Sequence, residues 1–328
     1  MEEVIIKIAV ALVFLAIVIF AFIKRKTGVS SKGMAGSFTN DLTAEAKLGK
    51  LDKIIGRDKE VERIIHILLR RKKNNPILLG EPGVGKTAII EGLAQNIINE
   101  KIPGALKNKT ILALDLNKLM AGTQFRGELE NRLQNVLTQI QNEKSNVILF
   151  IDEIHLLQQL GKSEGAMSIS DVIKPILANG KLQIIGATTW KEYNEYIKPD
   201  EAFDRRMQPV FVDEPDQKTA IAMLKGLKSL YETYHKVKIT DKAIEAAVKL
   251  SDKKINHRYL PDKALDLIDE ACAKAAIDAE NAHMVPLGVV HTASKQSKNT
   301  VDVDDIQVVI DQWLIHNKED ARRDARKK

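Results

Sequence analysis

The chain has 328 residues, a net charge of +6 and 44% apolar residues, so it can form two globular domains. Its single cysteine, Cys272, excludes an internal disulfide and a metal site with several cysteine ligands, and its helical surroundings favour a small core residue. Half of the net charge of +6 belongs to the tail Asn317–Lys328, which has six Lys/Arg and three Asp/Glu. The composition therefore makes a nucleic-acid partner unlikely.

The N-terminal stretch Val4–Ile23 has twenty residues, which is the length that a helix needs to span a bilayer. Its one charged residue, Lys7, lies near the end and can reach the interface. A cleaved signal peptide is the alternative, but two acidic residues open the chain and the basic triplet 24–26 follows the apolar run. The pattern predicts an uncleaved transmembrane helix in residues 1–25. The positive-inside rule then places the N-terminus outside and the rest in the cytoplasm, as in a single-pass protein of the cell membrane.

Residues 26–48 follow the apolar stretch and include the Gly-, Ser- and Lys-rich run Thr27–Asn40, which is typical of a flexible linker. We expect a large domain in residues 49–214. Near its start, Glu60–Arg70 has the apolar spacing of a helix.

The next segment has the pattern G-x-x-x-x-G-K-T, which is typical of a phosphate-binding loop. Its residues are Gly80, Glu81, Pro82, Gly83, Val84, Gly85, Lys86 and Thr87. The apolar run Pro76–Leu79 before it predicts a buried strand, and Ala88–Ile98 after it predicts a helix. Backbone N–H groups and the helix N-terminus can then hold a polyphosphate, with Lys86 at the β- and γ-phosphates and Thr87 on Mg²⁺. A chance glycine turn is the alternative.

Further strands are predicted at Lys109–Asp115, Val147–Glu153 and Leu182–Thr189, and helical patterns alternate with them. This alternation predicts a parallel sheet with right-handed crossovers, whose ligands bind at the carboxyl ends of the strands. An apolar strand that ends in Asp152 and Glu153 is the Walker B pattern. Asp152 would bind Mg²⁺ and Glu153 would polarise the attacking water, although a solvated carboxylate is the alternative for Glu153.

Taken together, these motifs resemble the first ATPase module of the Clp-type AAA+ unfoldases and disaggregases, the ClpA/ClpB/ClpC group. The part of the sequence that resembles this family extends from about Leu51 to Leu314. It includes Ile55–Asp58, Lys73–Pro76, Gly80–Thr87, Ala121–Glu128, Ile151–Glu153, Gly186–Thr189, Arg205-Arg206 and Leu260–Ala264. The resemblance implies an α/β P-loop AAA+ domain with a parallel sheet, a helical lid, and ATP and Mg²⁺ as cofactors.

The resemblance also assigns roles to residues outside the phosphate-binding loop. Ile55 and Gly56 would line the adenine pocket, and Ala88, directly after the phosphate-binding loop, would also contact the nucleotide. Thr189 would be sensor 1, close to the γ-phosphate or the attacking water. Arg205 and Arg206 would act as arginine fingers on the nucleotide of a neighbouring subunit in a homo-oligomer, and the resemblance implies a hexamer. Without the resemblance, an exposed surface pair is the simpler interpretation.

The segment Gln124, Phe125, Arg126 and Gly127 matches the pore loop of the family, which would grip an extended protein chain. The family usually has Tyr after a basic residue where this chain has Phe125 after Gln124, so charge and hydrogen bonding are reduced. A core position for Phe125 is the alternative. A second segment, Gly161–Met167, resembles the lower pore loop of the family.

Residues 215–316 are rich in helical patterns, at Asp216–Tyr234, Thr240–Leu250 and Pro261–Ala279, and predict the lid; residues 317–328 form a basic tail. Many AAA+ lids have an arginine at the position called sensor 2. This chain has no arginine at the corresponding position, and no role is assigned to the nearby Arg258. The second ATPase module and its peptidase-docking loop are absent, so a peptidase partner is not expected.

Three functions are compatible with the sequence. The first is a membrane-anchored ATPase that unfolds or remodels protein substrates through a ring pore. The second is a nucleotide-switched assembly factor for a membrane complex, without threading. The third is a DNA-acting motor, which lacks the support of a basic groove with interleaved aromatics.

Overall fold

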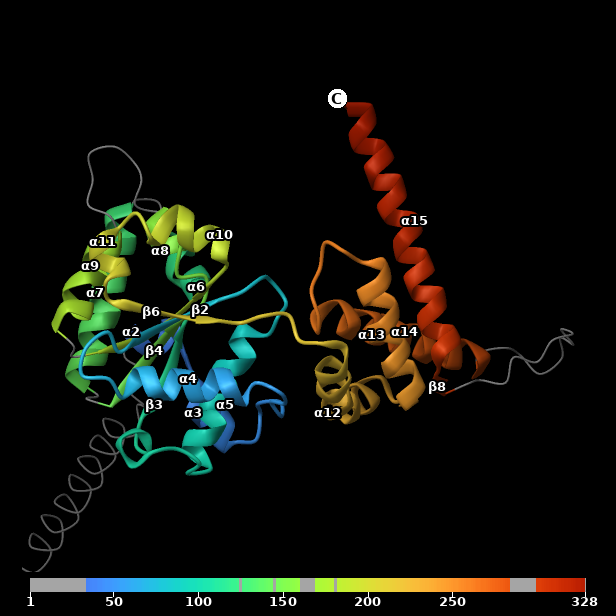
Figure 1. Ribbon diagram of the computed structural model, residues 1–328, viewed down its shortest axis with the longest axis horizontal. Coiled ribbons are helices and arrows are strands. Elements are labelled where there is room, and N and C mark those ends of the chain that lie inside the picture. Colours follow the sequence, from blue (N-terminus) through green and yellow to red (C-terminus); the bar gives the residue numbers. More distant parts are fainter. Residues whose placement is uncertain are drawn as a thin grey trace, which may run out of the picture. The chain divides into compact units, whose positions relative to one another are not determined.

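The computed structural model describes residues 34–123, 126–143, 146–159, 169–179, 182–283 and 299–327 (Figure 1). The chain divides into two compact units. Unit 1 consists of Met1–Asn40 and Asp115–Lys144, and unit 2 consists of Asp41–Leu114 and Ser145–Lys328.

Unit 1 is helical in its described part. Its helices are α2 (Met34–Phe38), α6 (Leu116–Met120) and α7 (Arg126–Glu143). The backbone N–H of Ala35 donates to Gln139 Oε1 at 2.8 Å, which fastens α2 to α7. Arg132 on α7 donates to the carbonyl of Ala121 at 2.9 Å, which fastens the end of α6 to the same helix. The short strand β1 (Thr39–Asp41) straddles the sequence boundary between the two units.

The sheet of unit 2 brings the ends of its central strands together. Its strands are β2 (Asn75–Leu79), β3 (Thr110–Leu114), β4 (Val147–Ile151), β5 (Gln183–Thr188) and β6 (Met207–Phe211), in the order β3-β4-β5-β2-β6. All pairings between these strands are parallel. Ile151 pairs with Gly186, and Leu79 pairs with Thr188. The carboxyl ends of β4, β5 and β2 therefore meet at one edge, where parallel sheets bind ligands.

Buried apolar side chains explain why these strands form. Every residue of β2 and of β4 is buried, as expected for strands covered on both faces. Helices α4 (Asp58–Leu68) and α5 (Lys86–Ile98) pack along the sheet in the core of this part (Figure 1). The remaining helical segments of the sheet-bearing part are α3 (Leu42–Lys47), η1 (Gly104–Leu106), α8 (Leu156–Gln159), α9 (Ile169–Asn179), α10 (Trp190–Glu192), η2 (Tyr193–Ile197) and α11 (Glu201–Asp204).

A second hydrophobic core lies within the helical C-terminal part of unit 2 (Figure 1). Its elements are α12 (Gln217–His235), β7 (Lys238–Ile239), α13 (Asp241–Lys254), α14 (Asp262–His283), β8 (Thr300–Val301) and α15 (Val303–Lys327). Asp216 and Thr240 cap α12 and α13 by accepting from the N–H groups of Thr219 and Ala243. We call this part, from Asp216 onward, the lid.

The α/β sheet with mostly parallel strands and the helical lid confirm the coarse fold predicted from the sequence. Strand β4 ends at Ile151, because Asp152 and Glu153 already lie in the following turn. Strand β6 was not predicted, since Met207–Phe211 contains a proline and three side chains that are not buried.

The predicted membrane span Val4–Ile23 lies outside the described residues. Among the residues that the structure does describe, we find no helix that combines the length and apolar character needed to cross a bilayer.

Candidate functional site

The glycine-rich loop joins β2 to α5 and has the backbone that the motif requires. Gly83 and Gly85 have φ angles of +81° and +95°, a region that residues with a Cβ rarely adopt. Gly85 is the residue at the N-cap of α5, a helix of 13 residues. The loop therefore points backbone N–H groups and a helix N-terminus to one place, which is an anion-binding arrangement.

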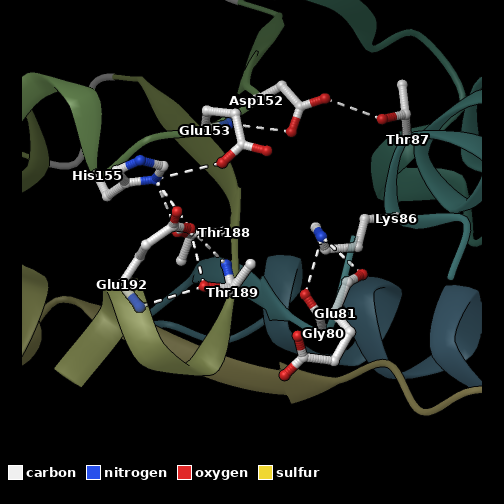
Figure 2. Close-up of polar contacts among 10 residues, drawn as sticks. All are labelled: Gly80, Glu81, Lys86, Thr87, Asp152, Glu153, His155, Thr188, Thr189 and Glu192. Atoms are coloured by element: carbon white, nitrogen blue, oxygen red, sulfur yellow. Dashed lines mark hydrogen bonds and ion pairs between the residues drawn. The ribbon is translucent and has the colours of Figure 1, made fainter. Parts of the chain in front are cut away.

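Lys86 is the first residue of α5 and is buried, with an exposed fraction of 7%. Its Nζ donates to the carbonyl oxygens of Gly80 at 2.9 Å and Glu81 at 3.1 Å (Figure 2). The ammonium group is thus held above the loop by neutral acceptors. Its positive charge is available to an anion in the loop.

Thr87 and Asp152 come from two different strand–helix connections and meet at the edge of the sheet. The Thr87 hydroxyl donates to Asp152 Oδ2 at 2.9 Å (Figure 2). The other carboxylate oxygen, Oδ1, accepts from the backbone N–H of Glu153 at 3.0 Å. A hydroxyl and a carboxylate are hard oxygen donors, so this pair fits Mg²⁺ with a nucleotide.

Glu153 follows Asp152 with a left-handed backbone, φ +48°, and its side chain is 47% exposed. Such a conformation is unusual for a residue other than glycine and is found at functional sites. Partial burial, followed by the charges of Asp152 and Glu192, raises the pKa of the Glu153 carboxyl, and Lys86 opposes this effect. A carboxylate with a raised pKa accepts a proton more readily than an ordinary glutamate.

A hydrogen-bonded cluster adjoins Glu153 (Figure 2). His155 Nδ1 lies 3.3 Å from Glu153 Oε2, 3.4 Å from Glu192 Oε2 and 2.9 Å from Thr188 Oγ1. Burial lowers the pKa of the His155 imidazole, although Glu192 and Asp152 oppose this. Burial also raises the pKa of Glu192, but hydrogen bonds from Thr189 and Thr188 outweigh it and lower that pKa overall.

Thr189 and Glu192 form a capping box at the start of α10. Glu192 Oε2 accepts from the Thr189 hydroxyl at 2.9 Å, from the Thr189 N–H at 3.2 Å and from the Thr188 hydroxyl at 3.0 Å. One ligand atom each from Glu153, His155 and Glu192 lies within 4.8 Å of the others, close enough for a metal ion. Because this Glu192 oxygen already accepts three hydrogen bonds, we assign the group to hydrogen bonding.

A cavity of about 380 Å³ opens in front of the glycine-rich loop. It combines a polar end at the loop with apolar walls from the segment before α4 and from the lid, as a nucleotide with phosphates and a base requires. Its lining includes Asp52–Ile55, Arg57, Pro82–Ala88, Glu91, Asp152, Glu153, Met223, Leu227, Pro261, Asp262 and Leu265.

The structure brings most of the predicted nucleotide site together. Ile55 lines the cavity, and Gly56, with φ +71°, packs against Thr219 at the start of the lid. Gly80 and Glu81 contribute the carbonyl groups that hold Lys86. Thr189 joins the cluster beside Glu153 through its capping box rather than lining the cavity.

Other predicted residues lie elsewhere. Arg205 and Arg206 are exposed at the end of α11, where Arg205 pairs with Glu201 at 2.7 Å. Gln124 and Phe125 lie outside the described residues, as does the second loop Gly161–Met167. Arg126 and Gly127 form the start of α7 in unit 1.

Three residues of the site, Glu192, Arg57 and His155, were not identified from the sequence. Thr189-x-x-Glu192 has the spacing of a capping box, which predicts a helix start but not its place beside His155. Arg57 is buried and donates to the carbonyl of Val84 in the glycine-rich loop at 2.6 Å. His155 and Arg57 carry no sequence signal beyond their place in the motifs.

Comparison with known proteins identifies both parts of unit 2. Residues 76–212 match the ATPase family associated with various cellular activities (AAA), and residues 216–324 match the AAA lid domain.

Curated relatives cover most of this chain. It is 54% identical over 250 residues to the ATP-dependent Clp protease ATP-binding subunit ClpC of Staphylococcus aureus (strain USA300), which covers 76% of the chain and 30% of that protein. It is also 54% identical over 241 residues to the chaperone protein ClpB of Oceanobacillus iheyensis, covering 74% of the chain and 30% of that protein. The chain thus spans about a third of the length of these relatives.

Solved structures show the same similarity. Hsp104 with ATPγS and FITC casein aligns with a TM-score of 0.73 at 40% identity, covering 84% of this chain and 45% of that one. The extended Hsp104:casein complex of S. cerevisiae aligns with a TM-score of 0.69 at 42% identity, covering 77% of this chain and 42% of that one.

These findings correct the predicted localisation. The predicted cell-membrane location is contradicted by the curated relatives of the chain. The relatives are named as a protease's ATP-binding subunit and as a chaperone, and neither name describes a membrane protein. The prediction rested on the hydropathy of one apolar run, which none of the matched family models includes.

Three findings lead to one family: a buried lysine and a threonine at the glycine-rich loop, two carboxylates directly after β4, and matches to both the AAA family and the AAA lid domain. The chain belongs to the Clp-type AAA+ ATPases, an ATP-hydrolysing family.

Proposed function

We propose that this chain hydrolyses ATP to unfold or remodel protein substrates within a ring. The observation that carries the proposal is the contact of Thr87 with Asp152, with Glu153 next to it, beside a cavity that the glycine-rich loop and the lid both line. This arrangement offers the phosphate-binding, metal-binding and proton-accepting groups that phosphoryl transfer to water needs, apart from an arginine finger. The proposal includes a large domain at 49–214 and a lid at 215–316.

Two predicted bounds need correction. Residues 42–47 of the predicted flexible linker form α3, whose Leu42 is buried in the core with the sheet, and the predicted basic tail 317–328 continues α15 as far as Lys327.

Binding is the task of the loop, Lys86 and the oxygen pair. The N–H groups of the loop and the α5 N-terminus would hold the phosphates, and Lys86 would neutralise their charge. Thr87 and Asp152 would hold Mg²⁺, which supplies charge neutralisation at the β- and γ-phosphates when bound. Ile55, Met223 and Leu265 offer apolar surface for the base.

Proton transfer is the task of Glu153. Its carboxylate is half exposed at the cavity and has a raised pKa, so it can orient a water molecule and take its proton. The positive charge of Lys86 opposes this rise in the Glu153 pKa, but burial and the charges of Asp152 and Glu192 outweigh it. We assign orientation and proton acceptance to Glu153.

Assembly into a ring is proposed because the nucleotide site of one chain lacks the arginine that the family resemblance assigns. Arg205 and Arg206 are exposed and do not line the cavity of their own chain. An arginine that acts on a neighbouring subunit must be exposed in the single chain, so their position fits fingers that act in trans in a hexamer.

Protein substrates are proposed from the relatives and from the pore-loop motif. Two of the aligned Hsp104 structures carry casein in their descriptions. Phe125 is the aromatic residue of the motif and remains a sequence-based prediction. An aromatic side chain can grip an extended chain through apolar contact without reading its sequence.

The test is ATP-dependent unfolding of a tagged fluorescent model protein by the full chain, with Phe125→Ala and Phe125→Tyr compared. We expect Phe125→Ala to lose unfolding and substrate-stimulated hydrolysis while it still binds nucleotide and assembles. Phe125→Tyr should keep both activities, because the aromatic ring and the length of the side chain are preserved. If Phe125→Ala unfolds the substrate at the wild-type rate, threading through this loop is wrong, and a nucleotide-switched assembly factor becomes the better account.

A further inference from the structure

We propose that His155 is a positioning residue that holds the Glu153 carboxylate in its productive orientation through the polar contact of Nδ1 with Oε2 at 3.3 Å. The inference rests on the proposed function of Glu153. His155 lies in the turn after β4, two residues beyond Glu153, and its side chain is buried. Its Nδ1 is within 3.4 Å of three oxygen atoms, one of which belongs to Glu153.

The hydrogen-bond pattern determines which ring nitrogen carries the proton. The Thr188 hydroxyl has one hydrogen, and it donates this hydrogen to Glu192 Oε2 at 3.0 Å. Toward His155, Thr188 can then only accept, at 2.9 Å. The carboxylate oxygens of Glu153 and Glu192 also only accept. Because all three neighbours of Nδ1 are acceptors, Nδ1 carries the proton. It donates to Thr188 Oγ1 at 2.9 Å, and the polarised N–H also faces Glu153 Oε2 at 3.3 Å.

The partners of His155 on the far side form a fixed frame. Thr188 is the last residue of β5 and is fully buried. Glu192 is held by three hydrogen bonds from Thr188 and Thr189. The backbone N–H of Ile154 donates to the carbonyl of Ala187 at 3.0 Å, which ties the turn after β4 to β5. Glu153, in contrast, has a side chain that is 47% exposed and depends on His155 for a contact with this frame.

A neutral imidazole suits this task better than a cation would. Burial lowers the pKa of His155, so the ring stays uncharged near neutral pH. A neutral N–H can orient the carboxylate without cancelling the negative charge with which Glu153 attracts a proton.

The test compares three substitutions in the full chain by steady-state hydrolysis and by binding of a fluorescent ATP analogue. His155→Asn keeps an N–H group near the position of Nδ1, whereas His155→Gln moves the amide toward Nε2 and His155→Leu removes the donor. We expect kcat to fall about tenfold or more for the Leu and Gln variants, because the geometry for proton transfer is lost. For the Asn variant, which keeps that geometry, kcat should stay within about threefold of the wild type. KM and analogue affinity should change less than about twofold, because ground-state binding is untouched.

A double-mutant cycle asks whether His155 acts through Glu153. In a Glu153→Gln background, His155→Leu should cause no further loss of hydrolysis, since the group that it positions is already gone. His235→Leu is the matched control: His235 is also mostly buried and lies 2.6 Å from the Asp269 carboxylate, but it lies in the lid outside the site. It should leave kcat unchanged.

Two results would overturn the positioning role: wild-type kcat in both His155→Leu and His155→Gln, or additive losses in the cycle. An equal loss in Asn, Gln and Leu with unchanged melting temperature would also overturn it, because the donor at Nδ1 would then be irrelevant. Failure of the proposed function is a separate result, since Glu153→Gln alone would then hydrolyse at the wild-type rate.

Discussion

Asp262, the first residue of α14 in the lid, lies directly against Gly83 of the glycine-rich loop. A Cβ placed on Gly83 would lie 2.7 Å from the Asp262 Cβ. Its neighbours Pro261 and Leu265 line the same cavity as the loop. Glu214, at the connection to the lid, accepts from the Leu260 N–H at 2.6 Å and lies 3.3 Å from the Lys263 ammonium. Loop, connection and lid therefore form one contiguous set of contacts around the cavity.

Gly83→Ala is expected to weaken nucleotide binding about tenfold or more. The substitution meets a φ of +81°, which costs about 1–2 kcal/mol for a residue with a Cβ, and it also pushes against Asp262. Titration with a fluorescent ATP analogue measures the effect. Gly104→Ala is the control, because nothing lies within 4 Å of a Cβ at Gly104. Equal affinities for the Gly83 variant and the wild type would show that loop and lid are not this tightly packed in solution.

Arg57 is expected to couple the loop to the lid connection. Its guanidinium donates to the carbonyls of Val84 at 2.6 Å and Asp213 at 3.0 Å, and it pairs with Glu60 at 2.9 Å. Lysine has one ammonium group and cannot reproduce this fork. Arg57→Lys should lower the free energy of unfolding by about 2 kcal/mol, as for a lost hydrogen bond of a buried charged group.

Urea unfolding, with and without ATP, measures the free energy of unfolding of the Arg57→Lys variant. Arg70→Lys is the matched control, because Arg70 is exposed and donates to Gln208 on the surface. The control should change the unfolding free energy by less than about 0.5 kcal/mol. An Arg57 variant as stable as the control would mean that the three contacts contribute no net stability.

Arg205→Ala and Arg206→Ala should each lower hydrolysis without changing the melting temperature, since both residues are exposed in the single chain. The measurement is ATPase activity in rings mixed with Lys86→Ala subunits. Partial recovery is expected, because some interfaces then combine an intact arginine with an intact loop. No recovery in rings shown to be mixed would argue against action in trans.

Cys272 should resist thiol reagents in the folded protein. It is fully buried, and burial, followed by the charges of Asp269 and Glu232, raises the pKa of its thiol to about 12. The thiolate is the reactive form, so raising the pH from 7 to 9 should still leave this thiol protonated in the folded chain. Labelling with a coloured disulfide reagent, with and without urea, measures the protection. Rapid labelling at pH 8 without urea would contradict the packing of α14.

Local patterns predicted the parts of the site that are continuous in sequence. Strand β2, the glycine-rich loop and α5 follow one another, so their apolar runs and glycines predict this strand–loop–helix unit directly. The apolar run of β4 likewise predicts a buried strand, so the carboxylates Asp152 and Glu153 directly after it are expected at the carboxyl edge of the sheet.

Contacts between distant segments could not be predicted in the same way. The Arg57 guanidinium reaches the carbonyl of Val84, 27 residues later, and a backbone carbonyl leaves no trace in a residue pattern. His155 and Thr188 meet only because β4 and β5 are neighbours in the sheet, which depends on the strand order. Arg205 and Arg206 are assigned by resemblance alone, since their proposed partner is another copy of the chain.

The most direct test of the account compares Glu153→Gln with Lys86→Ala in ATP binding and in hydrolysis. Glu153→Gln should bind ATP as tightly as the wild type and hydrolyse it at least about a hundredfold more slowly, because only the proton acceptor is lost. Lys86→Ala should lose binding itself, because the buried ammonium group at the loop is removed. If Glu153→Gln hydrolyses ATP at the wild-type rate, the site described around Glu153 is not where this chain performs its chemistry.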